Sequence, residues 1–443
     1  MSKYTSETII RTVRENHIQF VRLQFTDIFG QLKSVTLPAS QIEKAVNGQI
    51  MFDGSSIEGY TRIEESDQYL RPDLDTFAVL PWNQEYGVCA RMICDVCNPD
   101  GTAFSGDPRG VLHKVLKKAA DMGYTFNVGP ECEFFLFKTD ADGKPTTKTN
   151  DEVGYFDQGP LDSAEFTRRQ ICLALEKIGF EIEASHHECA AGQHEIDFKY
   201  ADALTAADNI MTFKLAVKTL ARKDGLHATF MPKPIFGVAG NGMHINMSLF
   251  RDGKNAFYDE NGTHQLSPIA YQFIAGVLEH IPAICALSNP LVNSYKRLVP
   301  GYEAPCYISW STGNRSALIR VPAPRGTGTR LELRNPDPSC NPYLALAACL
   351  AAGLDGIERG LTPPEEATEN IYELTGEQRI ARGIGSLPSS LKEALDALRA
   401  DPLVCGVLGE HALSQYLAGK EEEWSAYCTR VSSWEVERYI TLY

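Results

Sequence analysis

Short runs of alternating polar and apolar residues recur along the chain and are separated by turn residues. Alternation with a period of two is typical of strands that have one buried face. In the first part of the chain it predicts strands at 20–25, 76–81 and 88–96, with an exposed turn at Asp53 and Gly54. We therefore expect this part to form a small α+β domain.

A turn-rich segment at 97–102 separates this region from the remainder of the chain. Asp107 and Pro108 then supply an N-cap and a first-turn proline for a helix. A chain of 443 residues also exceeds what one core usually serves. The sequence therefore predicts two domains, 1–102 and 103–443. In the second, the expected strands are 131–137, 195–200, 243–250, 316–321 and 329–334, and the expected helices are 163–178, 207–223, 271–287 and the segments after Pro342 and Leu387.

Charge and composition exclude several classes of protein. A formal charge of −15 and a pI of about 5.2 argue against binding to nucleic acids or anionic membranes. The longest apolar stretch is expected at about 343–354, which is too short to span a bilayer, and no basic and apolar leader precedes the first helix. The twelve cysteines are scattered without a disulfide framework. We therefore expect a cytoplasmic protein.

Several strand-like segments place carboxylates on one face. Glu131 and Glu133 are two residues apart, so on a strand both point to the same side. Like charges this close repel unless a cation or a proton lies between them. Taken alone, the pair could equally belong to a solvated edge strand. Other segments repeat the pattern, with Glu188 and Glu195, with His244, Asn246 and Ser248, and with Glu332 between Arg330 and Arg334.

The polar faces predict a sheet with one side lining a concave site and the other covered by helices. Carboxylates with a single imidazole favour Mg²⁺ or Mn²⁺ over Zn²⁺, and such ions commonly serve phosphoryl transfer. His186, His187 and His194 are left out of the ligand set, because histidines in such positions are more often structural. No Walker or dinucleotide glycine pattern is present, but the glycine-rich segment 237–242 would allow close approach of its backbone to a substrate.

Longer motifs carry a resemblance that extends over essentially the whole chain. The most specific is the run NSYKRLVPGYEAP at 293–305. At these residues the sequence resembles type I glutamine synthetase, in its shorter feedback-regulated subgroup. The resemblance implies a small N-terminal β-grasp domain plus a larger catalytic domain with a curved antiparallel sheet covered by helices. The other motifs are FDGSS at 52–56, GPECEF at 129–134, SHHE at 185–188, KP at 233–234, GMH at 242–244, NRS at 314–316 and NPYL at 341–344.

The resemblance also implies a set of site residues. Two or more Mg²⁺ or Mn²⁺ ions per subunit are expected, with ATP as a substrate. One ion, nearer the glutamate and ammonia chemistry, would be held by Glu133, Glu188 and Glu195. The other, nearer the nucleotide phosphates, would be held by Glu131, His244 and Glu332. Glutamate would be bound by Gly240, Arg297, Glu303, Arg315 and Arg334, and ATP by Glu183, Asn246, Ser248, Arg315 and Arg320.

The implied reaction, which serves nitrogen assimilation, joins glutamate and ammonia at the expense of ATP through γ-glutamyl phosphate. Asp53 matches the residue that takes a proton from ammonium, and it would reach the site from a neighbouring subunit. Glu303 matches a flap residue that keeps water from the intermediate. Arg315 would stabilise the transferred phosphoryl group. Family members assemble as dodecamers of two stacked hexameric rings, so the same assembly is expected here.

Three features bear on substrate binding and regulation. Ala239 replaces an asparagine usual in the family, and Asn241 occupies a serine position beyond it. Tyr372 aligns with a tyrosine that is modified in another subgroup. Arg62 matches a residue tied to feedback inhibition by glutamine, which predicts such inhibition and leaves room for nitrogen-regulatory protein partners. The alternatives are a γ-glutamyl ligase that acts on another amine and a noncatalytic scaffold, although all six ligand positions are filled.

Overall fold

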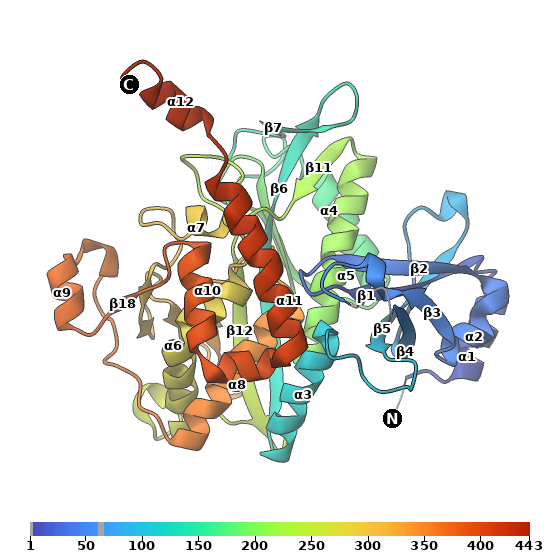
Figure 1. The fold of residues 1–443 in the computed structure, drawn as a ribbon, viewed down its shortest axis with the longest axis horizontal. Coiled ribbons are helices and arrows are strands. Elements are labelled where there is room, and N and C mark those ends of the chain that lie inside the picture. Colours follow the sequence, from blue (N-terminus) through green and yellow to red (C-terminus); the bar gives the residue numbers. More distant parts are fainter. Residues whose placement is uncertain (1–2, 61–65) are drawn as a thin grey trace.

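The computed structural model describes residues 3–60 and 66–443 (Figure 1). Its N-terminal part contains a five-stranded sheet in the order β2-β1-β5-β4-β3, in which β1 and β5 are parallel and the other pairs are antiparallel. A separate apolar core, which includes Ile9, Leu23 and Met92, joins this sheet to α1. The predicted α+β organisation of this region is confirmed. The elements are α1 (Ser6–Glu15), β1 (Phe20–Thr26), β2 (Leu32–Pro38), α2 (Ile42–Val46), β3 (Ile50–Asp53), β4 (Asp67–Val79) and β5 (Cys89–Cys97).

The larger part is built around a second sheet with the order β15-β16-β17-β12-β6-β9-β8. The sheet was predicted to be antiparallel, but β15 and β16 pair in parallel, because the chain bends through 312–318 and returns in the same direction. Its strands are β6 (Thr125–Thr139), β8 (Ile182–His187), β9 (Gln193–Phe198), β12 (Met243–Arg251), β15 (Trp310–Ser311), β16 (Ile319–Arg320) and β17 (Leu331–Leu333), with β7 (Pro145–Thr149), β10 (Ala201–Asp202), β11 (Leu226–Thr229) and β13 (Lys254–Asn255) beside them.

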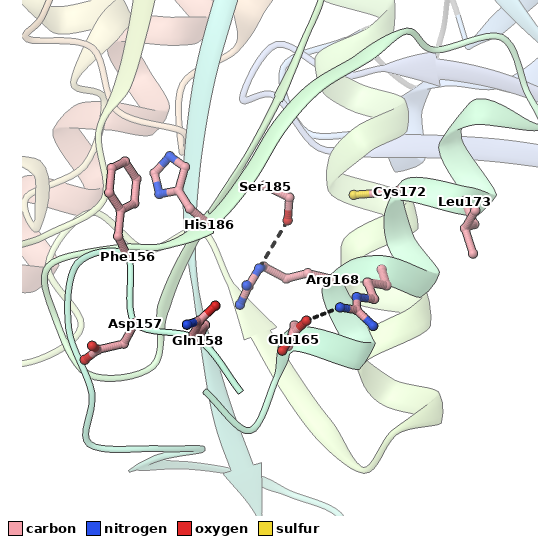
Figure 2. A pocket seen from close by; sticks show the side chains of 10 residues that line it. Phe156, Asp157, Gln158, Glu165, Arg168, Cys172, Leu173, Ser185 and His186 are labelled. Carbon is pink, nitrogen blue, oxygen red and sulfur yellow. Dashed lines mark hydrogen bonds and ion pairs between the residues drawn. The ribbon is translucent and has the colours of Figure 1, made fainter. Parts of the chain in front are cut away.

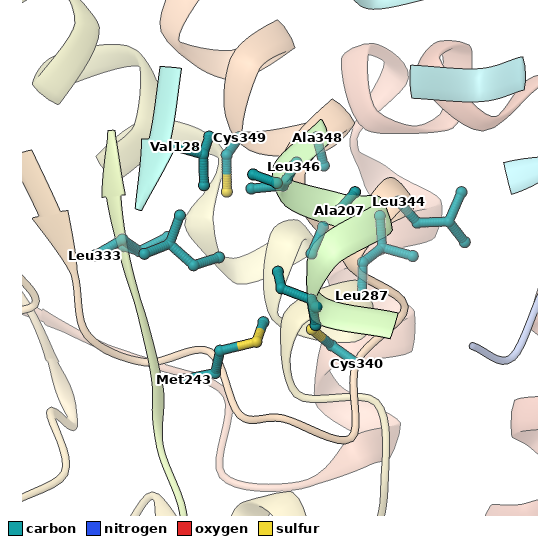
Figure 3. Packing of buried hydrophobic residues seen from close by; sticks show 14 of the residues in the cluster. Val128, Ala207, Met243, Leu287, Leu333, Cys340, Leu344, Leu346, Ala348 and Cys349 are labelled. Atoms are coloured by element: carbon teal, nitrogen blue, oxygen red, sulfur yellow. The ribbon is translucent and has the colours of Figure 1, made fainter. Parts of the chain in front are cut away.

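Helices cover the apolar face of this sheet. Figure 3 shows Val128, Met243 and Leu333 from three adjacent strands facing side chains such as Leu287 and Leu344 from the helices. Because side chains alternate along a strand, burying this apolar row leaves the intervening polar residues on the opposite face. The helices are α3 (Pro108–Asp121), α4 (Glu165–Glu176), α5 (Ala203–Lys223), α6 (Pro268–Ser288), α7 (Ser294–Arg297), α8 (Pro342–Arg359), α9 (Gly376–Ala381), α10 (Leu391–Ala400), α11 (Pro402–Cys428) and α12 (Ser433–Tyr439). A small two-stranded antiparallel sheet pairs β14 (Tyr307–Ile308) with β18 (Gly385–Ser386), which lies far along the chain.

α6 and α8 approach each other closely in the centre of this core. A Cβ atom on Gly276 would lie 2.1 Å from the Ala352 carbonyl oxygen, and one on Gly356 would lie 2.1 Å from that of Gln272. α6 is also long and apolar enough to cross a membrane, although 67% of its apolar window is buried inside the protein, as in a core helix. The apolar stretch predicted at 343–354 lies within α8, which packs against α6.

Two predicted strands are shorter than their sequence pattern. The segment 316–321 contains only β16, because the Ser316 N–H and hydroxyl both donate to Asn314 Oδ1 and form a turn. The segment 329–334 contains only β17. Both strands nevertheless bring polar residues to the sheet face that carries the predicted site.

Arg109 of α3 joins the two parts of the molecule. Its guanidinium lies 2.7 Å from Asp73 and 2.6 Å from Asp95, both on the N-terminal sheet, and 3.0 Å from Asp208 of α5. The Tyr343 hydroxyl of α8 donates to the same Asp208 at 2.7 Å. A buried cation with this many partners fixes the relative position of the two sheets, because losing it would leave several carboxylates without compensation.

Candidate active site

The strand register gathers the predicted ligands on one face of the larger sheet. Glu131 on β6 lies opposite His244 on β12, and Glu133 lies opposite Glu195 on β9. His186 on β8 lies opposite the same Glu195. Side chains that are directly opposite on antiparallel strands have Cβ atoms about 4.5–5.5 Å apart, so like charges there repel.

Glu131, His244 and Glu332 form the first cluster. His244 Nδ1 lies 3.3 Å from Glu131 Oε2 and 3.5 Å from Glu332 Oε1. Glu332 is fully buried and also contacts the guanidinium groups of Arg320 and Arg334. Burial opposes ionisation of Glu131, but hydrogen bonding and the charge of His244 lower the pKa of Glu131 to about 2. Burial and the charge of Arg334 lower the pKa of His244, and a neutral imidazole is the form that binds a metal.

His186, Glu188 and Glu195 form the second cluster, beside Glu133. His186 Nδ1 lies 3.6 Å from Glu188, and its Nε2 lies 3.2 Å from Glu195. Glu133 Oε2 accepts a hydrogen bond from the Gly242 N–H at 2.7 Å. Burial and the charge of Glu188 raise the pKa of Glu133 to about 8, and burial and the charge of Glu133 raise the pKa of Glu195. His186, which is not among the predicted ligands, lies among these carboxylates.

The second cluster is short of positive charge. Glu195 Oε1 and Asp197 Oδ1 are buried without a hydrogen-bond partner among the described residues. Burial and the charge of Glu131 raise the pKa of Asp197 to about 7. A divalent cation at the second cluster would satisfy the Glu195 oxygen and reduce the repulsion, and carboxylates with one imidazole are ligands that suit Mg²⁺ or Mn²⁺. The residues present therefore fit a divalent cation at each cluster.

A cavity of about 440 Å³ opens over both clusters. Arg297 is buried at its base, where its guanidinium donates to the Asn335 carbonyl oxygen at 2.7 Å and is held in one orientation. Gly240 lines the cavity where no side chain would fit, because a Cβ atom there would lie 2.2 Å from the Pro232 carbonyl oxygen. The predicted substrate residues that line this cavity are Gly240, Arg297, Glu303, Arg315 and Arg334.

A second cavity of about 440 Å³ adjoins the first, and the two share Glu131 and Asp197. It contains three of the residues predicted to bind ATP, Glu183, Asn246 and Ser248. Arg320 was predicted to belong with them, but it lines the first cavity instead, because its guanidinium is drawn to the buried Glu332 carboxylate.

The second cavity also contains residues that the sequence analysis did not assign. Phe198, Tyr200 and Phe250 supply aromatic and apolar surface, and Arg330 donates from its Nε to Asn246 Oδ1 at 3.0 Å. The alternation that identified Glu195 also places Asp197 next to Phe198 and could have indicated these positions. A slot that combines aromatic rings with an arginine can bind a planar base together with anionic phosphates.

Two predicted residues are not brought to these cavities. Asp53 ends β3, where its carboxylate accepts hydrogen bonds from the Ser55 N–H at 2.9 Å and the Ser55 hydroxyl at 2.6 Å. These hydrogen bonds lower the pKa of Asp53, so it is ionised at neutral pH. Asp53 lines neither cavity of its own chain. Arg62 lies outside the described residues.

The structure also places the two departures in the glycine-rich loop. Ala239 lines the first cavity, where its side chain is shorter than the asparagine usual in the family. Asn241 is fully buried, and its side-chain amide donates to the Met231 carbonyl oxygen at 2.9 Å. Asn241 therefore does not replace the missing side chain at 239.

A third cavity, of about 580 Å³, lies between α4 and β8 (Figure 2). His186 lines both this cavity and the one over the metal clusters. Arg168 crosses it and donates to the Ser185 hydroxyl at 3.2 Å. Exposed Phe156 and Leu173 lie at its rim. None of the predicted catalytic or substrate residues lies here.

Known proteins and family models are similar to this chain over most of its length. The family models "Glutamine synthetase, beta-Grasp domain" and "Glutamine synthetase, catalytic domain" match residues 17–99 and 105–439. The chain is 60% identical to the glutamine synthetase of Clostridium saccharobutylicum over 100% of both chains. Its structure is similar to that of GmaS in complex with ADP (TM-score 0.89, 34% identity, 98% and 99% covered) and to Plasmodium falciparum glutamine synthetase (TM-score 0.87, 26% identity, 99% of both chains covered). The chain therefore belongs to the glutamine synthetase family, enzymes that use ATP and divalent metal ions to make glutamine from glutamate and ammonia.

Proposed function

We propose that the reaction proceeds through γ-glutamyl phosphate and serves nitrogen assimilation in the cytoplasm. The observation that carries this proposal is the contact between the two cavities at Glu131 and Asp197. A nucleotide in the aromatic cavity would present its γ-phosphate to a glutamate held in the arginine-lined cavity. The side-chain carboxylate of glutamate then attacks the γ-phosphate, and ammonia displaces phosphate from the acyl phosphate.

The residues of the two cavities divide this work. Arg297 and Arg334 bind the carboxylate and phosphoryl oxygens, and Gly240 lets the backbone approach glutamate. Arg315, which is exposed at the cavity mouth, stabilises the transferring phosphoryl group and contacts ATP. Divalent cations, when bound at the two clusters, supply Lewis-acid neutralisation of the phosphate and substrate oxygens. Glu303 closes the cavity mouth against water.

Asp53 acts in the site of a neighbouring subunit in this proposal. Its carboxylate is ionised and exposed at the end of a strand, as a group that must reach another chain requires. The C-terminal segment also supports an oligomer, since α12 projects from the body and leaves Trp434, Ile440 and Leu442 exposed (Figure 1). We propose the dodecamer of two stacked hexameric rings, in which each active site is completed by an adjacent chain.

The function is tested by the dependence of phosphate release on ammonium. With glutamate, ATP and Mg²⁺, the protein should release phosphate and form glutamine only when ammonium is present, and other amines should not replace it. Asp53→Asn should lower kcat/KM for ammonium by about 10²–10⁴-fold, the usual contribution of a positioned general base. Asp67→Asn is the matched control, because Asp67 is also an exposed aspartate and lies opposite Asp53 in the pairing of β3 with β4. Activity with an amine in place of ammonium would contradict the proposal.

The two metal clusters should differ in what they support. Glu131→Ala should chiefly raise the KM for ATP, whereas Glu195→Ala should chiefly impair the use of glutamate and ammonia. Each effect should be at least about tenfold, because even residues that only support a metal ligand contribute about 10- to 100-fold to metal affinity or activity. Glu181→Ala is the control, because Glu181 is exposed and pairs with Lys199. Steady-state kinetics with each substrate varied would separate the two, and an equal loss of ATP affinity in both variants would contradict the division.

Feedback inhibition by glutamine is proposed from Arg62. An Arg62→Ala variant should synthesise glutamine at the wild-type rate but require about tenfold more glutamine for inhibition. A tenfold change corresponds to the loss of about 1.4 kcal/mol of binding free energy for glutamine. Inhibition curves of the two proteins provide the measurement, and unchanged inhibition would rule out this role. A feedback-inhibited form would also be available to nitrogen-regulatory protein partners, which a pull-down with and without glutamine would detect.

The environment of Tyr372 argues against modification of its hydroxyl. The Tyr372 hydroxyl is half-buried and donates to the Ala304 carbonyl oxygen at 2.6 Å. Burial raises the pKa of this hydroxyl to about 12. In the described conformation the hydroxyl supports the loop that carries Glu303.

A further inference from the structure

Two loops border the cavity over the metal clusters. One is the glycine-rich loop, 236–242, which contributes Ala239 and Gly240, and the other is the flap, 299–305, which contributes Tyr302 and Glu303. The two loops are far apart in sequence. A cavity that excludes water from an acyl phosphate needs both loops in place at the same time.

Lys233 lies between these loops and contacts both. Its ammonium group is 3.7 Å from the centroid of the Tyr302 ring, and the same group donates a hydrogen bond to the Val238 carbonyl oxygen. A cation over the face of an aromatic ring is attracted to it, most strongly where water is excluded. Lys233 is 8% exposed, so this contact is largely shielded from solvent.

The backbone of Lys233 is fixed by the segment that precedes α7. Its N–H donates to Asn293 Oδ1 at 2.8 Å, and its carbonyl oxygen accepts from the Asn293 side-chain amide at 3.1 Å. Its side chain also supports the glycine-rich loop, since a Cβ atom on Gly240 would lie 3.3 Å from Lys233 Cδ. The ammonium therefore extends from a rigid base toward two loops.

The flap needs such support. Glu303 has a φ of 60°, a left-handed conformation that is unfavourable for a residue with a side chain. The flap also contacts Cys189, whose Sγ lies 3.7 Å from Glu303 Oε2, and Tyr372, whose hydroxyl donates a hydrogen bond to the Ala304 carbonyl oxygen. Lys233 differs from these two because its ammonium also reaches the glycine-rich loop.

We propose that Lys233 is a positioning residue that holds the flap and the glycine-rich loop together as one lid over the acyl phosphate. Lys233 is not among the residues that line the cavity, so it acts on the reaction through the two loops. A buried ammonium group costs free energy unless it is well partnered, and here its partners are the two loops. This role rests on the proposed function, because it assumes an intermediate that water would destroy.

The kinetic test compares Lys233→Met, which keeps the aliphatic stem and removes the charge, with Lys233→Arg. Water that reaches the acyl phosphate would regenerate glutamate and release phosphate, so ATP would be consumed without glutamine. We expect Lys233→Met to release at least about twice as much phosphate as glutamine. Loss of a shielded cation–π contact shifts the equilibrium between the closed and the open lid about tenfold toward the open lid, so water reaches more of the intermediate. Lys233→Arg, which keeps the cation, should restore a ratio near one. One phosphate per glutamine in Lys233→Met would overturn the proposal.

Lys218→Met is the matched control. Lys218, on α5, also lies over an aromatic ring, with its ammonium 5.7 Å from the centroid of Phe230, but that ring belongs to neither loop. This variant should keep the wild-type ratio of phosphate to glutamine. Excess phosphate in Lys218→Met as well would show that any such lysine gives the effect, and the specific role of Lys233 would be lost.

Hydrogen–deuterium exchange of the substrate-free protein tests the lid without catalysis. Amide exchange should become about tenfold faster in both 236–242 and 299–305 in Lys233→Met and in Tyr302→Leu, whereas Tyr302→Phe, which keeps the ring, should match the wild type. Faster exchange confined to 236–242 would overturn the coupling. If the wild type makes no glutamine, the proposed function fails, and the exchange experiment still decides whether Lys233 couples the loops.

Discussion

Mutual repulsion among carboxylates on adjacent strands is the constraint on which the structure depends. The pairing of β6 with β9 puts Glu133 directly opposite Glu195, and the pairing of β6 with β12 adds Glu131 beside His244. Burial makes the repulsion stronger, because little water is present to screen it. The sheet can hold this arrangement because its other face is packed against α5, α6 and α8 (Figure 3), so the backbone that carries the charges is rigid.

The same constraint organises the surrounding polar groups. Arg320 and Arg334 compensate the fully buried Glu332, whereas Glu195 retains an oxygen without a partner among the described residues. The first cluster is thus largely neutralised by the protein, and the second depends more strongly on a bound cation. Substrate groups enter a site in which positive charge comes from fixed arginines and from metal, and the lid formed by the two loops keeps the local dielectric low.

Much of the site could be predicted from local patterns. The spacing of Glu131 and Glu133 and the alternation around His244 depend only on strand geometry, and the large sheet preserves both. The resemblance to a known family added residues such as Arg297 and Gly240, whose roles no local pattern reveals. The domain organisation followed in part from the turn-rich segment near residue 102.

Other features depend on contacts between distant segments. His186 was set aside because a lone histidine carries little information, and only the register of β8 against β9 places it beside Glu195. Arg320 was predicted to contact the nucleotide because the resemblance matches it to the ATP site, whereas its contact with Glu332 across β16 and β17 is a tertiary contact that no local pattern reveals. Lys233 lies in a motif but gains its role from Tyr302, far along the chain.

The most direct test is the unfolding free energy of the metal-free protein as a function of pH. Glu133 has a pKa of about 8 in the folded chain and 4.5 as its ordinary value, so between these values the folded state binds more protons than the unfolded state. Stability should therefore fall as pH rises through this window, by up to about 1.4 kcal/mol per pH unit for each such carboxyl. Added Mg²⁺ or Mn²⁺ should raise the unfolding free energy, and this gain should be larger at higher pH, because the ligands must be deprotonated to bind. Glu133→Gln should flatten the metal-free slope. Metal-free stability that stays constant or rises across the window, or a slope unchanged in Glu133→Gln, would contradict the account.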